Sequence, residues 1–391
     1  MSSANRPAIS QTLDGSHGEV PMKSGSSIVD LAQRLQAIRN DAKDYIVPPS
    51  KLESVRAATV LQGDHDRLVI EMTNGHVQSF APSKWAHAQL AEYSDVPKAY
   101  YDRLNAENPA LLAKNVNHGF ELARTNNTAK ASGRMLRTHA GALRAMVSSR
   151  FRRLDNFDLF EAIAPSLIDL GFEPESAELT DRRLYLKCVS PRITSEVKKG
   201  DVVQYGLVVS NSDVGAGSLR VEPLVFRLVC LNGMIANVAK RHAHLGRNVV
   251  TDDVEELLTD ETRQLTDRAF WNTVRDVVTN FAKPEHFERE VNRLRVAADV
   301  PIKMFDLPTI IERTAKAVGI TTSEATKASI LDNLASGAHG AGMNKWGLAN
   351  AFTFAAQQEA LDYDSATDLE RAGSQVIELA PHQWDVINAS A

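Results

Sequence analysis

A change of pattern along the chain constrains the fold most. Residues 133–231 hold short apolar runs separated by turn residues, which is typical of strands. After residue 251, apolar residues recur at helical spacing nearly to the end. A doubly wound fold would instead alternate strands and helices regularly. The order of elements predicts an α+β fold, with an antiparallel sheet core and packed helices followed by a mainly helical C-terminal part.

Local signals place the individual elements. Asn74-Gly75 is a pair that a two-residue hairpin turn favours, because both residues take positive φ, and Ala140-Gly141 separates two further short runs. Pro223 indicates a bend or a position partly at a sheet edge. The predicted hairpins and strands are 67–80, 135–148, 184–189, 202–210 and 218–231. The predicted helices are 28–46, 84–90, 98–105, 109–120, 156–170, 252–281 and 344–360, the last being the final clear one.

Composition along the chain suggests three parts. Residues 1–27 are rich in Ser, Gly and Pro and carry almost no large apolar side chain, so they are expected to form a disordered tail. We expect residues 28–250 to form the α+β core domain and residues 251–391 to form the helical C-terminal region. No internal repeat of 20–50 residues is visible.

One segment stands out by its charge. The whole chain has a formal net charge of −5, whereas residues 124–153 hold eight basic residues and no acidic one. Seven of the eight are arginines, whose planar guanidinium pairs with phosphate through two parallel hydrogen bonds. Lys240 and Arg241 add a second basic spot. The candidate nucleic-acid-binding residues are Arg124, Lys130, Arg134, Arg137, Arg144, Arg150, Arg152, Arg153, Lys240 and Arg241.

Two alternative roles for this arginine strip (the basic residues of segment 124–153) stay open. The arginines could pair with acidic residues of the same chain, since the C-terminal half is acidic, or they could meet an acidic protein partner. Aromatic residues could stack on bases or lie in the core, and the candidates are Phe151, Phe157, Tyr185 and Tyr205.

Other chemistry finds little support in the sequence. Two cysteines exclude a disulfide scaffold and a four-cysteine zinc site, and His242 and His244 have no third metal ligand indicated. No pattern makes a positive case for an enzyme, so we expect no catalytic residue, no metal and no cofactor. No apolar run is long enough to span a bilayer, and no signal peptide is visible, so we expect a soluble cytoplasmic protein.

Several motifs together resemble a known family. The most distinctive are Ser149-Arg-Phe-Arg-Arg-Leu-Asp-Asn156, Tyr205-Gly-Leu-Val-Val-Ser-Asn-Ser-Asp-Val-Gly-Ala-Gly-Ser-Leu219 and Val225-Phe-Arg-Leu-Val-Cys-Leu-Asn-Gly-Met234. With Trp346-Gly-Leu-Ala-Asn350 and others, they resemble the phage/plasmid-like proteins of domain-of-unknown-function family 932, over roughly residues 85–360. The resemblance implies a protein of a mobile element acting in a bacterial cytoplasm, but no catalytic residue.

The charge and the resemblance lead to one hypothesis and two alternatives. We expect a non-enzymatic single-stranded DNA-binding protein of a phage or plasmid, working as a homo-oligomer in single-strand annealing or recombination. The order of a hairpin, a helix and a strand meander also looks like the core of Rad52-like annealing proteins, an analogy at the level of fold. The main alternative is a mobile-element interaction protein that binds a host protein through its arginine strip, without DNA binding. The second alternative is an enzyme whose site assembles from distant residues.

Overall fold

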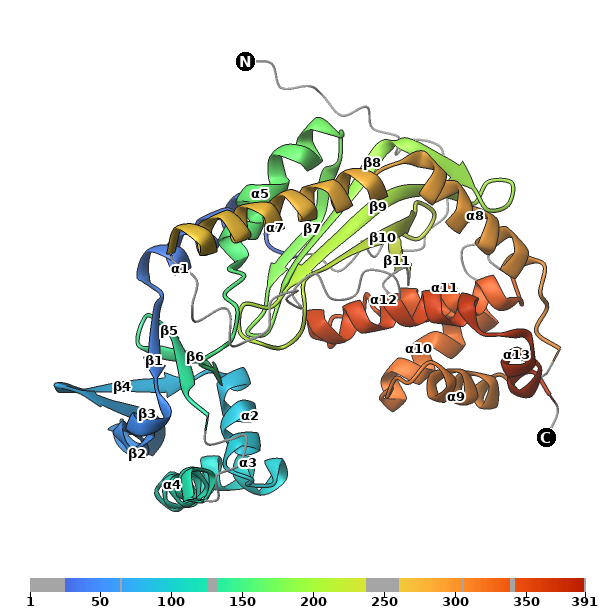
Figure 1. Cartoon of the computed structure of the whole chain (residues 1–391). Helices are drawn as coiled ribbons and strands as arrows, with labels where there is room; N and C mark the ends of the chain where they lie inside the picture. The colour runs from blue at the N-terminus through green and yellow to red at the C-terminus, as the bar shows by residue number, and fades with distance from the viewer. Residues whose placement is uncertain are drawn as a thin grey trace.

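The computed structural model describes residues 25–63, 65–125, 132–236, 260–303, 306–337 and 342–389. It contains two separate sheets, one of six strands and one of five, each packed against helices. The last part of the described chain is helical (Figure 1). The predicted α+β fold is therefore confirmed.

The first sheet has the strand order β1-β5-β6-β4-β3-β2. β4 and β6 run parallel, and the other neighbouring strands pair antiparallel. Its strands are β1 (Lys43–Val47), β2 (Val55–Gln62), β3 (His65–Asn74), β4 (His76–Pro82), β5 (Arg134–His139) and β6 (Ala142–Ser148). A short 3-10 helix, η1 (Pro49–Ser54), connects β1 to β2.

Both predicted hairpins are confirmed. The turn between β3 and β4 contains Gly75 at φ 74°, and the turn between β5 and β6 contains Ala140 at φ 48° and Gly141 at φ 75°. A left-handed backbone costs glycine nothing, which is why these pairs end one strand and begin the next.

Three helices pack on the first sheet: α2 (Lys84–Tyr93), α3 (Lys98–Glu107) and α4 (Pro109–Thr125). Ser83 caps α2 as predicted, because its side chain accepts a hydrogen bond from the Ala86 N–H at 3.1 Å. Helix and sheet residues such as Leu112, Val116 and Ile70 form one hydrophobic cluster, which is the core of this part of the molecule.

The second sheet is antiparallel throughout, with the order β11-β10-β9-β8-β7. Pro223 lies in β10 next to the last residue that pairs with β11, and its carbonyl oxygen still accepts from the Ala236 N–H at 2.8 Å, so its missing N–H lies where that pairing ends. The strands are β7 (Glu173–Leu179), β8 (Leu184–Glu196), β9 (Val202–Asn211), β10 (Arg220–Arg227) and β11 (Asn232–Ile235).

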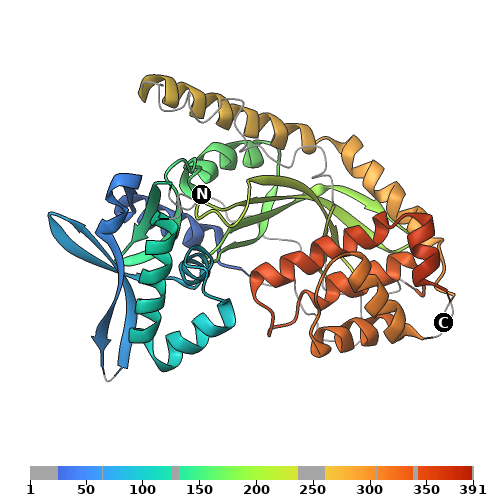
Figure 2. The same cartoon turned by 60° about the horizontal axis from the view of Figure 1, so that its bottom comes forward.

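Helices cover both faces of the second sheet. In Figures 1 and 2, α5 (Asn156–Asp169) and α7 (Asp260–Phe281) lie on one face, and α11 (Lys345–Ala355) and α12 (Tyr363–Glu378) lie on the other. One hydrophobic cluster joins these helices to the sheet. The remaining helices are α1 (Ile28–Asp41), α8 (Pro284–Ala298), α9 (Leu307–Ala317), α10 (Glu324–Ala335) and α13 (Pro381–Ile387).

The structure corrects two of the predicted elements. The helix predicted over residues 28–46 ends at Asp41, and the residues after it form the strand β1. Two helices, α12 and α13, follow the one that was predicted to be the last clear helix. The boundary predicted at residue 250, the predicted start of a helix at residue 252 and most of the predicted tail lie outside the described residues; Ser26 forms a β-bridge with Ala177.

Candidate nucleic-acid interface

The structure describes seven of the ten predicted nucleic-acid-binding residues. Lys130, Lys240 and Arg241 lie outside the described residues. The seven arginines separate into three groups: two that join the sheets, three that follow β6, and two that line a cavity. Their binding of nucleic acid stays a prediction, and their contacts within the chain differ from group to group.

Arg137 is buried at the junction of the two sheets, with 3% of its surface exposed. Its Nε lies 2.9 Å from Asp44 of β1 and its Nη2 lies 2.6 Å from Asp155, which precedes α5. Its Nη1 donates to the backbone oxygen of Asp213 in the loop between β9 and β10. Burial by itself lowers the pKa of this guanidinium, but the carboxylates of Asp155, Asp213 and Asp44 raise it above its ordinary value.

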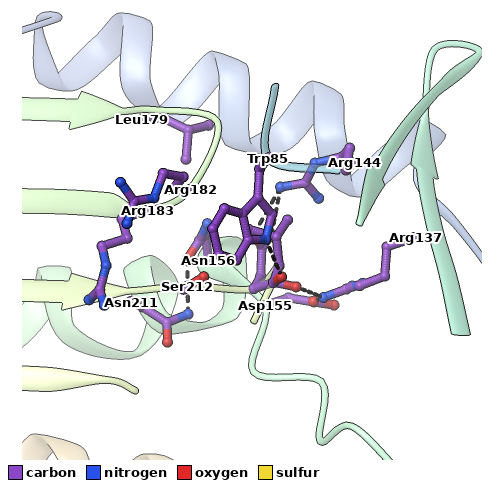
Figure 3. Close-up of polar contacts among 12 residues, drawn as sticks. Trp85, Arg137, Arg144, Asp155, Asn156, Leu179, Arg182, Arg183, Asn211 and Ser212 are labelled. Atoms are coloured by element: carbon purple, nitrogen blue, oxygen red, sulfur yellow. Dashed lines mark hydrogen bonds and ion pairs between the residues drawn. The ribbon is translucent and has the colours of Figure 1, made fainter. Parts of the chain in front are cut away.

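Arg144 binds the same loop. Its Nη2 lies 2.9 and 3.0 Å from the two carboxylate oxygens of Asp213. The indole N–H of Trp85, in α2, donates to the backbone oxygen of Val214 in that loop at 2.8 Å (Figure 3). Met135, Val147 and Val214 add an apolar contact at the same place. The loop after β9 therefore connects the second sheet to the first, and two arginines of the strip bind it.

Of the three arginines that follow β6, Arg150 and Arg153 are exposed and Arg152 is partly buried. Arg152 pairs with Asp267 of α7 at 2.9 Å and its guanidinium carbon lies 4.6 Å from the Phe270 ring centre. Arg153 lies 3.6 Å from Asp44. Arg150 is exposed just after the end of β6. For Arg137, Arg144, Arg152 and Arg153, the pairing with acidic residues of the same chain that the sequence left open is what the structure contains.

Arg124 and Arg134 lie together at a cavity of about 250 Å³. Arg124 is exposed in the last turn of α4, and Arg134 is the first residue of β5. The guanidinium carbon of Arg134 lies 4.3 Å from the ring centre of Tyr93, and the Tyr93 and Phe120 rings are 5.3 Å apart in an edge-to-face arrangement. Two arginines of the strip and two aromatic rings thus line one concave site.

The charge of this cavity is mixed. Arg56 also lines it, and Arg56 Nη2 pairs with Glu71 at 2.7 Å on the neighbouring strand. Glu53 and Glu121 line it as well. The described residues place no carboxylate within ion-pair distance of Arg124, so its charge is available to a ligand.

Asn117 lines the cavity and is held by two hydrogen bonds to one residue of β2. Its side-chain amide accepts from the Ala57 N–H at 2.7 Å and donates to the Ala57 carbonyl oxygen at 2.8 Å. This pair of bonds ties α4 to the edge strand β2. The rings of Tyr93 and Phe120 and the side chain of Arg56 come from three elements far apart in sequence, so no local pattern identified them as members of this site.

Of the predicted stacking residues, Tyr185 and Tyr205 belong to the core, with 1% and 0% of their surface exposed. Burial raises the pKa of the Cys188 thiol to about 12, which keeps this residue a neutral core side chain. His242 and His244 lie outside the described residues. Within the described ranges, no group of three or more His, Cys, Asp or Glu could hold a metal, and no helix is long and apolar enough to cross a membrane.

Comparison with known proteins finds a match to one family model. No curated protein matches this chain, and no solved structure matches it either. A family model with the description Domain of unknown function (DUF932) matches residues 144–294. The matched segment contains the second sheet, α5 and α7, together with the loop that Arg137 and Arg144 hold, whereas Arg124 and Arg134 precede it. Residues 144–294 of this chain are therefore similar to that family of unknown function.

Proposed function

We propose that this protein binds single-stranded DNA at the cavity lined by Arg124, Arg134, Tyr93 and Phe120. The observation that carries the proposal is this meeting of two guanidinium groups and two rings in one concave site. Guanidinium groups bind phosphates, and rings and guanidinium planes stack on unpaired bases. A double helix offers no free base faces, so the site favours a single strand.

The mixed lining suits binding without sequence readout. Glu53 and Glu121 offset part of the positive charge. Asn117 makes one accepted and one donated hydrogen bond with Ala57, which fixes the orientation of this amide on the protein rather than on a base. Arg137 and Arg144 support the fold around the site, because their guanidinium groups are occupied by carboxylates of the same chain.

The biological setting belongs to the same proposal. The motif resemblance, supported by the family match over residues 144–294, favours a protein of a phage or plasmid. Such a protein would act in the bacterial cytoplasm as a homo-oligomer, as a single-strand annealing or recombination mediator. It would need no cofactor for this, because aligning strands requires no bond to form or break.

The test is fluorescence anisotropy of a labelled oligonucleotide at several salt concentrations. Arg124→Ala/Arg134→Ala should weaken binding about tenfold or more, and should reduce the slope of log affinity against log salt by about 1.4, the loss of two phosphate contacts on a single strand. Phe120→Leu should weaken binding with little change of slope, because it removes a stacking surface and no charge.

Arg192→Ala/Lys199→Ala is the matched control. Arg192 is exposed on β8 and Lys199 is exposed in the turn between β8 and β9. Neither lines the cavity, and their replacement removes the same charge. Binding that falls equally in the control and in the cavity variant would mean that net charge alone attracts the strand. No binding by the wild-type protein at low salt would overturn the proposal.

A further inference from the structure

A second cavity lies between α8, α11 and α12, away from the first sheet. Its volume is about 340 Å³, within the range of about 300–1,000 Å³ that is usual for small-molecule sites. Val296, Ala297, Val300 and Ile377 form its apolar lining, and Lys345 and Arg293 supply its cations. Val296 is 67% exposed, so this apolar surface faces the solvent.

Lys345 is the unusual member of this cavity. It is the first residue of α11 and only 7% of its surface is exposed. Its ammonium group donates to the carbonyl oxygen of Leu379, which ends α12, at 2.8 Å, and lies 5.4 Å from the Trp384 ring centre. No carboxylate of the described residues lies within ion-pair distance of the Lys345 Nζ. Burial lowers the pKa of Lys345, and the positive charge of the nearby Arg293 lowers it further.

Two other buried cations of this part of the chain have counter-charges. Lys187 is paired with Glu370 at 2.6 Å, and Arg227 is paired with Asp201 at 2.5 Å. The exposed Arg293 also lies near carboxylates, 2.9 Å from Glu290 and 3.1 Å from Glu378. A buried charge is costly unless it is paired, so a chain that pairs Lys187 and Arg227 leaves Lys345 as the buried position that lacks an anion.

Three further N–H groups around this position, two of the Lys345 ammonium and one of the Trp384 indole, make no hydrogen bond with the described residues. The contact with Leu379 occupies one of the three N–H groups of the Lys345 ammonium. The indole N–H of Trp384, whose ring Lys345 faces, is buried and has no hydrogen-bond acceptor in the part of the chain that the structure describes. An anionic group beside Lys345 would supply the missing charge, while a hydrophilic anion alone would leave the apolar lining in water.

We propose that this cavity binds a small amphipathic anion, whose charged group pairs with Lys345 and whose aliphatic part lies on Val296, Val300 and Ile377. The site is separate from the proposed DNA-binding cavity, which lies on the first sheet, so the two proposals stand or fall independently. The pairing of a charged head with a short apolar body follows from the composition of the lining.

Isothermal titration of the full chain with octanoate and with 1-octanol tests this assignment. The two probes share their length and apolar body and differ in charge. We expect octanoate to bind about tenfold or more tightly than octanol, as a charge-assisted contact implies. Lys345→Met should remove this preference and leave octanol binding unchanged. Lys327→Met, at a partly buried lysine of α10 that does not line the cavity, should change neither.

A second variant, at an exposed residue, tests the proposal even if Lys345→Met fails to fold. Val296→Asp changes an exposed residue of the same cavity, so it should fold, and it should weaken both probes by removing apolar contact and adding a negative charge. Equal binding of the two probes to the wild-type protein, binding of neither, or unchanged octanoate binding by Val296→Asp would each overturn the proposal.

Discussion

Arg144 of β6 holds both carboxylate oxygens of Asp213, at 2.9 and 3.0 Å, across the boundary between the two sheets. The backbone oxygen of the same Asp213 accepts from Arg137 of β5. One residue of the loop after β9 thus binds two arginines of the first sheet. At these two positions, the strip that makes the sequence look like a ligand-binding surface connects two parts of one chain.

This pair should show a measurable coupling energy. Arg144→Ala and Asp213→Ala each leave a partner without its counter-charge in a site where Asp213 is only 4% exposed. The double variant removes both charges, so it should be less destabilised than the sum of the single variants, by about 1–3 kcal/mol. Urea denaturation of the four proteins measures this difference. Additive effects would show that the two side chains do not interact in solution.

Arg137 should be important for the stability of the protein, because it is buried and pairs with two carboxylates. Arg137→Met preserves much of the side-chain volume but leaves Asp44 and Asp155 without their closest cation. Breaking a buried ion pair by removing one partner costs about 3–5 kcal/mol. The control Arg192→Met, at an exposed position of β8, should change the free energy of unfolding by less than about 0.5 kcal/mol. Equal effects in the two variants would contradict the network described around Arg137.

Much of the fold could be predicted because its signals are local. Gly75 and Gly141 indicate their hairpins because glycine adopts the positive φ of a tight turn easily, whatever residues surround it. The strand β1 was missed for the opposite reason. Ile46 continues the helical spacing of Ile38 and Ala42, and only pairing with β5, almost 90 residues later, makes this segment a strand. The local periodicity of residues 28–46 carries no information about a partner strand so far along the chain.

The candidate site was predictable only in part. The sequence indicated Arg124 and Arg134 as members of a basic segment, but it could not separate them from Arg137, whose partner Asp44 lies 93 residues away. A charge pattern reports which residues are basic, whereas the identity of each partner depends on the topology of the sheets. Tyr93 and Phe120 have ordinary positions in two helices, and they become a site only when β5 brings Arg134 to them.

Gly217 should be a sensitive position in the loop between β9 and β10. Its φ is +153°, and a Cβ there would lie 1.8 Å from Nη2 of Arg183, which donates to the Ala216 oxygen at 2.7 Å. Gly217→Ala should therefore combine backbone strain with a clash and destabilise the protein by about 2 kcal/mol or more. Thermal unfolding measures the loss.

A second glycine separates the two causes. Gly63 has φ +62°, and no heavy atom lies within 4 Å of the position that a Cβ would take there, so Gly63→Ala should show backbone strain alone and a smaller loss. Arg183→Ala in the Gly217→Ala background should recover part of the stability, since it removes the clashing group. Equal losses of stability in Gly217→Ala and Gly63→Ala, with no recovery in the Arg183→Ala background, would show that the contact with Arg183 does not contribute to the destabilisation.

The helices on the first sheet should lose stability in mild acid through His87. This residue of α2 contacts the Tyr101 hydroxyl through Nδ1 at 2.8 Å, and burial, Lys98 and Arg67 lower its pKa from 6.5 to about 4. Between these values the unfolded chain binds the proton and the folded chain does not, so the free energy of unfolding falls as the pH falls. The contribution of the neutral imidazole is complete above pH 6.5.

A variant that cannot titrate isolates this effect. His87→Gln retains a polar group that can contact Tyr101 and removes the protonation step. The wild-type protein should lose about 2 kcal/mol more than His87→Gln between about pH 7.5 and pH 5, because about 1.4 kcal/mol accompanies each pH unit of this window. Urea denaturation at the two pH values measures the comparison. Parallel losses in the two proteins would mean that groups other than His87 dominate the acid response. The raised pKa of the Asp158 carboxyl acts in the opposite direction, because the folded chain binds that proton more readily than the unfolded chain.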